Sequence, residues 1–119
     1  MKTIIAGGRE ITDYELVKQA IRDSKFIITE VVSGKCRGVD RLGERYAKEN
    51  NLHVEPFPAE WDKYKLAAGS IRNEQMAKYA DALIAIWDGK STGTSNMIDW
   101  ARHYKLTVFV KRLDGVITF

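Results

Sequence analysis

The chain has 119 residues, 45% of them hydrophobic, and its 19 Lys and Arg against 16 Asp and Glu give a formal net charge of +3 at pH 7. This length predicts a single domain over residues 1–119, built around one hydrophobic core. The basic residues are spread along the chain and form no stripe, which disfavours a nucleic-acid partner and suits an anionic small molecule.

A lone cysteine, Cys36, excludes an internal disulfide. Residues 1–8 lack the basic flank and apolar core of a signal peptide, and no stretch approaches the roughly 18 apolar residues of a membrane helix. We therefore expect a cytoplasmic protein that does not associate with a membrane.

The first part of the chain alternates short apolar runs with segments of helical spacing, which is typical of βαβ units. Residues 2–6 are predicted as a strand, and residues 12–15 have the spacing of a capping box that starts a helix. Residues 26–32 are predicted as a second strand, and residues 52–57 as a third that ends at the prolines. The expected inward residues of the two helices between these strands are Leu16, Val17, Ala20 and Ile21, then Val39, Leu42, Tyr46 and Ala47.

The second part continues the same alternation after an irregular segment at 59–70. We predict a helix from about 71 to 79, the most apolar strand at 82–87 and a polar loop at 88–94. A further helix follows, and then a strand at 106–110. The inward residues expected for this last helix are Met97, Ile98, Ala101 and Tyr104. Residues 1–111 would form the core, and 112–119 a C-terminal tail or an added strand.

Five strands joined by right-handed crossovers predict a Rossmann-like, three-layer α/β/α fold with a mainly parallel sheet. Ligands of such sheets bind beyond the carboxyl ends of the strands. The turns after the first, second and fourth strands combine glycine with cations or hydroxyls, which suits phosphate, although tight turns and solvated charges have the same composition. The candidate binding residues in these turns are Gly7, Gly8 and Arg9; Ser33, Gly34, Arg37 and Gly38; and Asp88, Gly89, Ser91, Gly93 and Thr94. Arg37 is the preferred cation among them.

Familiar cofactor motifs are absent from these turns. The first turn lacks the G-x-G-x-x-G spacing of dinucleotide sites, and Ile84 stands where a Walker A loop needs its first glycine. His53 and His103 have no partners at zinc-ligand spacing. We therefore expect no cofactor and no metal.

Read in order, the segments 6–9, 33–40, 67–76, 80–89 and 93–94 resemble the YspA-related branch of the SLOG superfamily over about residues 1–111. The resemblance implies a Rossmann-like domain for a nucleotide or nucleotide-derived ligand. Relatives include DprA-type DNA-binding proteins and the LOG phosphoribohydrolases. Arg72 and Met76 match the arginine and methionine of the LOG segment R-K-x-x-M, so the resemblance makes Arg72, with Asn73, a ligand-facing candidate.

The match to the LOG phosphate loop is only partial. Gly93 and Thr94 align with its G-T pair, but Met97 stands where the family has its catalytic glutamate. A thioether cannot stabilise an oxocarbenium-like centre or position a water. Weak substitutes are Asp88, Glu74 and Asp99, which are equally well explained as a turn residue and solvated helix charges.

Three functions therefore stay open. The first is a sensor, carrier or sequestering protein for a nucleotide-like small molecule, in which Trp61 could stack on a base or simply pack as a lid. The second is LOG-like hydrolysis of a nucleoside 5′-monophosphate. The third, which is disfavoured, is DprA-like binding of single-stranded nucleic acid. The resemblance and the Trp100-bearing helix also suggest a homo-oligomer.

Overall fold

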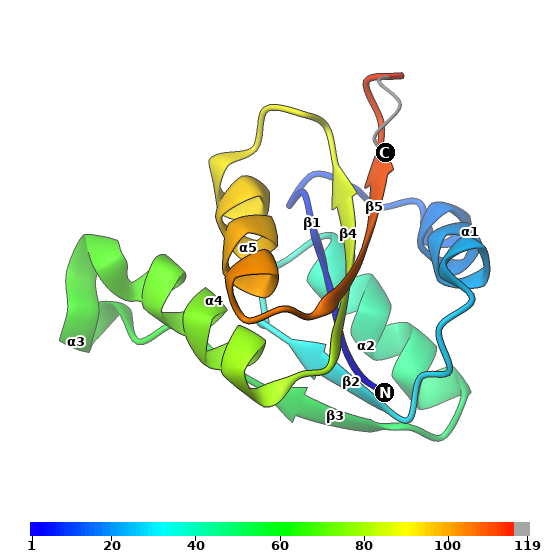
Figure 1. Cartoon of the computed structure of the whole chain (residues 1–119), viewed down its shortest axis with the longest axis horizontal. Helices are drawn as coiled ribbons and strands as arrows, with labels where there is room; N and C mark the ends of the chain where they lie inside the picture. The colour runs from blue at the N-terminus through cyan, green and yellow to red at the C-terminus, as the bar shows by residue number, and fades with distance from the viewer. Residues whose placement is uncertain (116–119) are drawn as a thin grey trace.

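The structure is a computed structural model that describes residues 1–115. Its five strands form one parallel sheet in the order β3-β2-β1-β4-β5 (Figure 1). The strands are β1 (Lys2–Gly7), β2 (Glu30–Ser33), β3 (His53–Pro56), β4 (Ala82–Trp87) and β5 (Thr107–Arg112). The helices are α1 (Tyr14–Ser24), α2 (Val39–Glu49), α3 (Trp61–Tyr64), the 3-10 helix η1 (Lys65–Ala67), α4 (Ala68–Tyr79) and α5 (Thr92–His103). The predicted Rossmann-like fold is confirmed.

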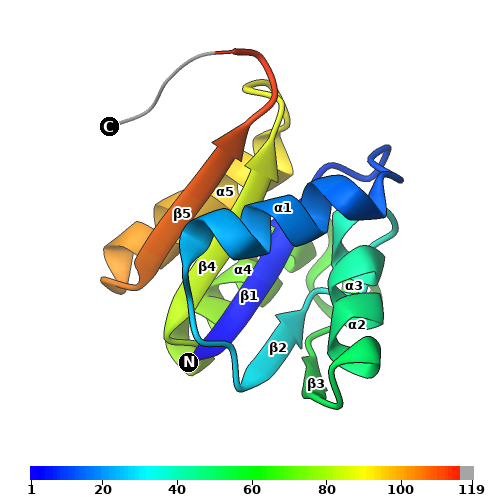
Figure 2. The ribbon, with the colours of Figure 1, turned by 90° about the vertical axis from the view of Figure 1, so that its right-hand side faces the viewer.

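Helices cover both faces of the sheet, with α1 and α2 on one side and α4 and α5 on the other (Figure 2). Successive strand residues point to opposite faces, so Ile4 and Leu83 pack in the core beneath α4 and α5, whereas Ile5 and Ile84 pack beneath α1 and α2. Because both faces are buried, β4 reads as a continuous apolar run.

The crossovers after β1 and β2 use the face of α1 and α2, and those after β3 and β4 use the opposite face. Neighbouring strands β1 and β4 therefore send their chains to opposite sides, and their carboxyl ends mark the switch point of the sheet. Figure 1 shows the loops after both strands at the same end of the molecule.

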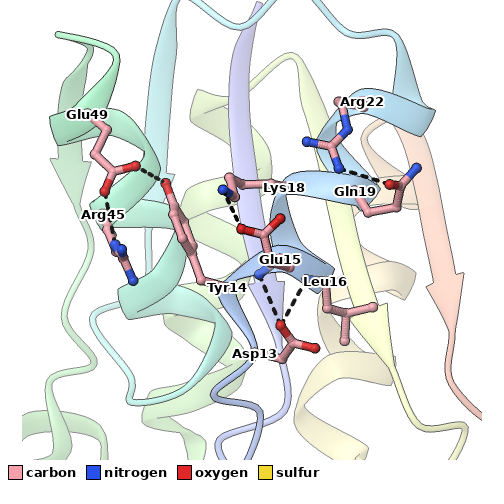
Figure 3. A network of polar contacts seen from close by, with 9 residues as sticks. All are labelled: Asp13, Tyr14, Glu15, Leu16, Lys18, Gln19, Arg22, Arg45 and Glu49. Carbon is pink, nitrogen blue, oxygen red and sulfur yellow. Dashed lines mark hydrogen bonds and ion pairs between the residues drawn. The ribbon is translucent and has the colours of Figure 1, made fainter.

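The start of α1 corrects the predicted capping box. Asp13, not Thr12, is the N-cap, and its carboxylate accepts the N–H groups of Glu15 at 3.0 Å and Leu16 at 3.4 Å (Figure 3). With the helix begun at this register, Tyr14 is buried and Leu16 is only half-buried.

Tyr14 also joins the two helices on its face of the sheet. Its hydroxyl donates to Glu49 Oε1 on α2 at 2.8 Å, and Arg45 holds the other oxygen of Glu49 at 3.0 Å (Figure 3). This contact ties the first turn of α1 to the end of α2.

The second strand is shorter than predicted. Residues 26–32 have a strand-like composition, yet β2 begins only at Glu30, which pairs with Lys2. Because β1 itself begins at Lys2, the preceding residues have no strand to pair with there. Phe26 and Ile28 instead pack against the core beneath α1 and α2.

The remaining differences concern element boundaries. Residues 59–70, predicted as irregular, contain α3, η1 and the first turn of α4, which begins at Ala68. Strand β5 extends to Arg112, and residues 113–115 follow it outside any helix or strand. The rest of the predicted tail, 116–119, lies outside the described residues. Within residues 1–115, no helix has the length and apolar character needed to cross a membrane.

Candidate functional site

A cavity of about 770 Å³ opens beyond the carboxyl ends of β1 and β4, at the switch point of the sheet. We call it the edge cavity. Its volume lies in the range of small-molecule sites. The sequence-predicted residues that line it are Gly7, Gly8, Arg9, Trp61, Arg72, Asn73, Asp88, Ser91, Gly93 and Thr94. Those that do not line it are Ser33, Gly34, Arg37, Gly38, Gly89 and Glu74.

Arg72 on α4 connects the cavity wall to the loop after β2. Its side chain is buried, with the residue only 8% exposed, and Nη1 donates to the carbonyl oxygen of Gly34. Nε donates to Asn73 Oδ1 at 2.9 Å, and Nη2 lies 3.7 Å from Cys36 Sγ. A guanidinium has five N–H donors, so Arg72 keeps donors for a ligand after making these contacts.

A chain of amide and hydroxyl groups joins α4 to α5 beside this arginine. Asn73 Nδ2 donates to Asn96 Oδ1 at 3.0 Å, and Asn96 Nδ2 donates to Ser70 Oγ at 3.2 Å. Trp100 Nε1 also donates to Ser70 Oγ, at 3.1 Å. The network holds the first turns of α5 against α4, and thereby sets the position of one wall of the cavity.

The first turn of α5 faces the edge cavity. Ser91 is the N-cap, and its Oγ accepts the N–H of Thr94 at 3.5 Å. The first N–H groups of a helix have no intrahelical partners and carry a partial positive charge. Gly93 lies in this turn, and a Cβ added there would meet nothing within 4 Å. The turn can therefore be approached closely by an anion.

Asp88 shapes the loop that leads into α5. Its Oδ1 accepts the N–H groups of Lys90 and Ser91, both at 2.8 Å. These hydrogen bonds, that from Ser91 first, lower the pKa of Asp88. The carboxylate thus acts as a turn residue, although it also lines the cavity.

Gly38 determines the conformation of the loop after β2. It has a φ of +80°, and a Cβ there would collide with the carbonyl oxygen of Gly8. Gly38 therefore allows the loop after β2 to pack against the loop after β1.

Sequence reasoning missed Asp40, in the first turn of α2. Asp40 lines the cavity although the residue is only 6% exposed, and its Oδ2 accepts the N–H of Cys36 at 3.3 Å. Burial raises the pKa of Asp40 to about 6, against the opposing effects of the Cys36 N–H and the Arg72 charge. The available signal was its place in the segment 33–40, one helical turn after Arg37.

Cys36 and Asn96 also line the cavity and were not predicted. Cys36 Sγ lies 3.9 Å from Arg9 Nη2, in addition to its contact with Arg72. Cys36 lies in the segment 33–40, but neither residue type marks a ligand contact, because a half-buried thiol and a helix amide have many ordinary roles. Only the folding of distant segments brings them to this wall.

Several other candidates lie elsewhere or at the margin. Arg37 pairs with Glu10 at 2.5 Å, and both side chains are exposed. Glu74 accepts the hydroxyl hydrogen of Tyr104 at 2.6 Å, outside the cavity. Met97 also lines the cavity, and it is buried, as its helical spacing predicted, with the residue 1% exposed. Trp61 is half-exposed at the rim.

No group of three or more His, Cys, Asp and Glu within residues 1–115 is arranged to hold a metal ion. The positively charged residues that line the cavity are Arg9 and Arg72. The acidic residues that line it are Glu10, Asp40 and Asp88. Glu10 is exposed and paired with Arg37, and Asp88 is exposed and bonded through Oδ1 to its own turn, so Asp40 is the acidic group of the lining that is buried.

Comparison with known protein families gives a match over the first part of the chain. The sequence model of the family described as YspA, cpYpsA-related SLOG family matches residues 1–64. The matched part runs from β1 through α3 and contains the loops after β1 and β2. Arg72 and the first turn of α5 lie beyond it. No curated protein and no solved structure matches the chain.

Proposed function

The chain belongs to the YspA, cpYpsA-related SLOG family, and from this premise we propose that it binds a nucleotide or nucleotide-derived phosphate ligand in the edge cavity. The observation that carries the proposal is a single geometry. At the switch point of a parallel sheet, the N-terminal turn of α5 and two arginines line one cavity of ligand size.

The phosphate end of the ligand belongs at the first turn of α5. There the helix offers unpaired N–H groups, Gly93 leaves the approach open, and the hydroxyls of Ser91 and Thr94 lie 3.3 Å apart. Arg9, on the loop after β1, adds a positive charge to the lining. These groups together suit a phosphate better than any single glycine turn does.

The base belongs near the rim formed by α3 and η1. Trp61 and Leu66 line the cavity there and are 50% and 99% exposed. An aromatic plane can stack on a base, and an exposed leucine at a cavity rim gains from covering an apolar ligand. Trp61 is therefore the base-stacking residue of this proposal.

The placement of the acidic candidates supports binding rather than N-glycosidic cleavage. Met97 stands where the resemblance to LOG enzymes would put a glutamate; it lines the cavity, but its side chain packs in the core. Asp88 is bonded to its own turn, and Glu74 is bonded to Tyr104 away from the cavity. We therefore propose a sensor, carrier or sequestering role for the site.

Isothermal titration calorimetry with nucleoside monophosphates, cyclic nucleotides, ADP-ribose and inorganic phosphate tests the proposal. We expect at least one nucleotide to bind, and to bind more tightly than inorganic phosphate, because the rim adds contacts to the base. A folded sample that gives no binding heat with any nucleotide contradicts the proposal. Chromatography of the titrated mixtures reports whether free base has formed, and release of base would replace a binding role with a hydrolytic one.

We further propose a homo-oligomer through the helix α5, which carries Trp100. Trp100 is half-buried and stacks on Tyr104 with ring centroids 6.1 Å apart. Native mass spectrometry of freshly purified protein measures the number of subunits and any co-purified ligand together. A monomer at all accessible concentrations contradicts this part of the proposal.

A further inference from the structure

Asp40 is the one acidic residue of the cavity lining that is buried, within the part of the chain that the structure describes. Within residues 1–115, the Asp40 carboxylate accepts a single hydrogen bond, from the Cys36 N–H to Oδ2, and it forms no ion pair. An ionised carboxylate can accept about four hydrogen bonds. No fully buried polar side-chain atom within residues 1–115 lacks a hydrogen-bond partner, so the free oxygen of this carboxylate still reaches the open cavity. A ligand that covers it must bring hydrogen-bond donors of its own, because an unsatisfied buried carboxylate is costly.

The nearby arginine does not supply those donors. Arg72 approaches Asp40 across the backbone of Gly34, where an added Cβ would lie 2.7 Å from Arg72 Nη1 and 2.9 Å from Asp40 Oδ2. The Arg72 guanidinium is directed instead to the Gly34 carbonyl, Asn73 and Cys36. The two groups thus flank one loop without pairing, and the Asp40 carboxylate remains available to the cavity.

The chemistry of the missing donor follows from charge. A phosphate placed beside the unpaired Asp40 carboxylate would be repelled, because both groups are negatively charged. The anion-binding turn of α5 follows β4, whereas Asp40 follows β2, and β1 lies between these two strands. Two strand spacings, about 10 Å, separate β2 from β4, so the turn of α5 and Asp40 lie at different places along the sheet edge. A ligand that reaches both must therefore carry neutral donors at some distance from its phosphate.

We propose that Asp40 accepts hydrogen bonds from the 2′- and 3′-hydroxyls of a ribose, so that the edge cavity selects ribonucleotides over 2′-deoxyribonucleotides. This inference rests on the proposed function. A vicinal diol presents two neutral O–H donors, which match the two oxygens of a carboxylate. Selection arises because a deoxy ligand leaves a buried acceptor without its donor.

Calorimetry with AMP and 2′-deoxyAMP, and with GMP and 2′-deoxyGMP, tests the inference on the wild-type chain and on Asp40→Asn. In the wild type we expect each ribonucleotide to bind about 10- to 100-fold more tightly than its deoxy form, as for a hydrogen bond to a charged group. In Asp40→Asn the ratio should fall to within about threefold. Glu10→Gln, which removes an exposed carboxylate of the same lining, should keep the wild-type ratio.

Each other outcome has a definite meaning. Equal affinities of the wild type for ribo and deoxy forms overturn the inference and leave the proposed function standing, whereas no binding of any nucleotide defeats the proposed function itself. A ribose preference that survives in Asp40→Asn assigns the selection to another residue. If Asp40→Asn changes the AMP-to-GMP ratio instead, Asp40 contacts the base and the inference is wrong.

A second measurement covers the case in which Asp40→Asn does not fold. The ribo-to-deoxy ratio of the wild type should be high at pH 8 and fall at pH 5, as Asp40 gains a proton and loses its charge. The charged groups that act on Asp40 are Arg72 on α4, Arg9 on the loop after β1 and Glu44 on α2. The phosphate titrates alike in both ligands, so it cancels in the ratio, and a ratio independent of pH overturns the inference.

Discussion

Arg72 and Arg37 are both arginines near β2 in space, but only one of them is held by the fold. Arg72 is buried and bonded to the Gly34 carbonyl and to Asn73, whereas Arg37 extends from the surface to an exposed glutamate. A buried guanidinium keeps one orientation and loses little entropy when a ligand arrives. At the scale of the residue, burial therefore separates a candidate ligand contact from a solvated charge.

Arg72→Ala should weaken nucleotide binding by about 1.5–3 kcal/mol, the usual worth of a hydrogen bond to a charged group. It should also lower the free energy of unfolding by about 1–3 kcal/mol, because the buried Gly34 carbonyl loses its donor. Calorimetry and urea denaturation measure the two effects.

Arg37→Ala is the matched control for this change. Its exposed ion pair with Glu10 is worth at most about 1 kcal/mol, so both quantities should stay close to those of the wild type. An unchanged affinity in Arg72→Ala would remove Arg72 from the binding site, even if the protein became less stable.

At the scale of the element, the first turn of α5 and the loop before α2 use glycine in opposite ways. Gly38 is required by its positive φ and by its contact with the Gly8 carbonyl. Gly93 sits in a helix, where no neighbour would meet a Cβ. Since glycine costs about 1 kcal/mol relative to alanine inside a helix, its presence at the cavity wall favours a role in ligand approach.

Gly93→Ala should therefore keep or raise the free energy of unfolding, by up to about 1 kcal/mol, and weaken nucleotide binding by about tenfold because the methyl group obstructs a phosphate at the helix N-terminus. Thermal denaturation and calorimetry give the two values. Gly38→Ala is the contrasting variant, and it should lower stability through backbone strain. Full affinity in a stable Gly93→Ala protein would place the phosphate elsewhere.

At the scale of the whole molecule, Asp40 links stability to pH. Burial raises its folded-state pKa from an ordinary 3.8 to about 6, so the folded chain holds this proton more tightly than the unfolded chain does. The contribution of this carboxyl to the free energy of unfolding is fully present below pH 4 and is lost as the pH rises through 6. At about 1.4 kcal/mol per pKa unit, the loss at pH 7 is on the order of 3 kcal/mol.

Asp40→Asn should remove this loss. The difference in free energy of unfolding between the variant and the wild type should therefore shift in favour of the variant by about 2–3 kcal/mol between pH 4 and pH 7. Urea denaturation across this range, without ligand, measures the difference, and taking a difference cancels the other titrating groups. A difference that stays constant with pH would show that the Asp40 carboxyl is not desolvated in the native state.

The resemblance of five ordered segments was sufficient for the family. The pattern of residues along the chain was sufficient for the five strands, the four longer helices and the parallel sheet. These follow from local spacing: β4 is a continuous apolar run, and α5 buries Met97, Ile98 and Ala101 at helical intervals. Spacing was misleading at residues 26–29, which were predicted to begin a strand. They have no neighbouring strand to pair with, and local sequence does not show whether such a neighbour exists.

The tertiary structure alone decided which side chains share the cavity. Arg72 came from a motif, but its contacts with Gly34 and Cys36 cross more than thirty residues of sequence. Asp40 carries no mark beyond its place in the segment 33–40, because a carboxylate in the first turn of a helix is ordinarily exposed. Its burial depends on α4 packing beside the loop after β2, and burial is what turns an ordinary acidic residue into a candidate for binding ribose.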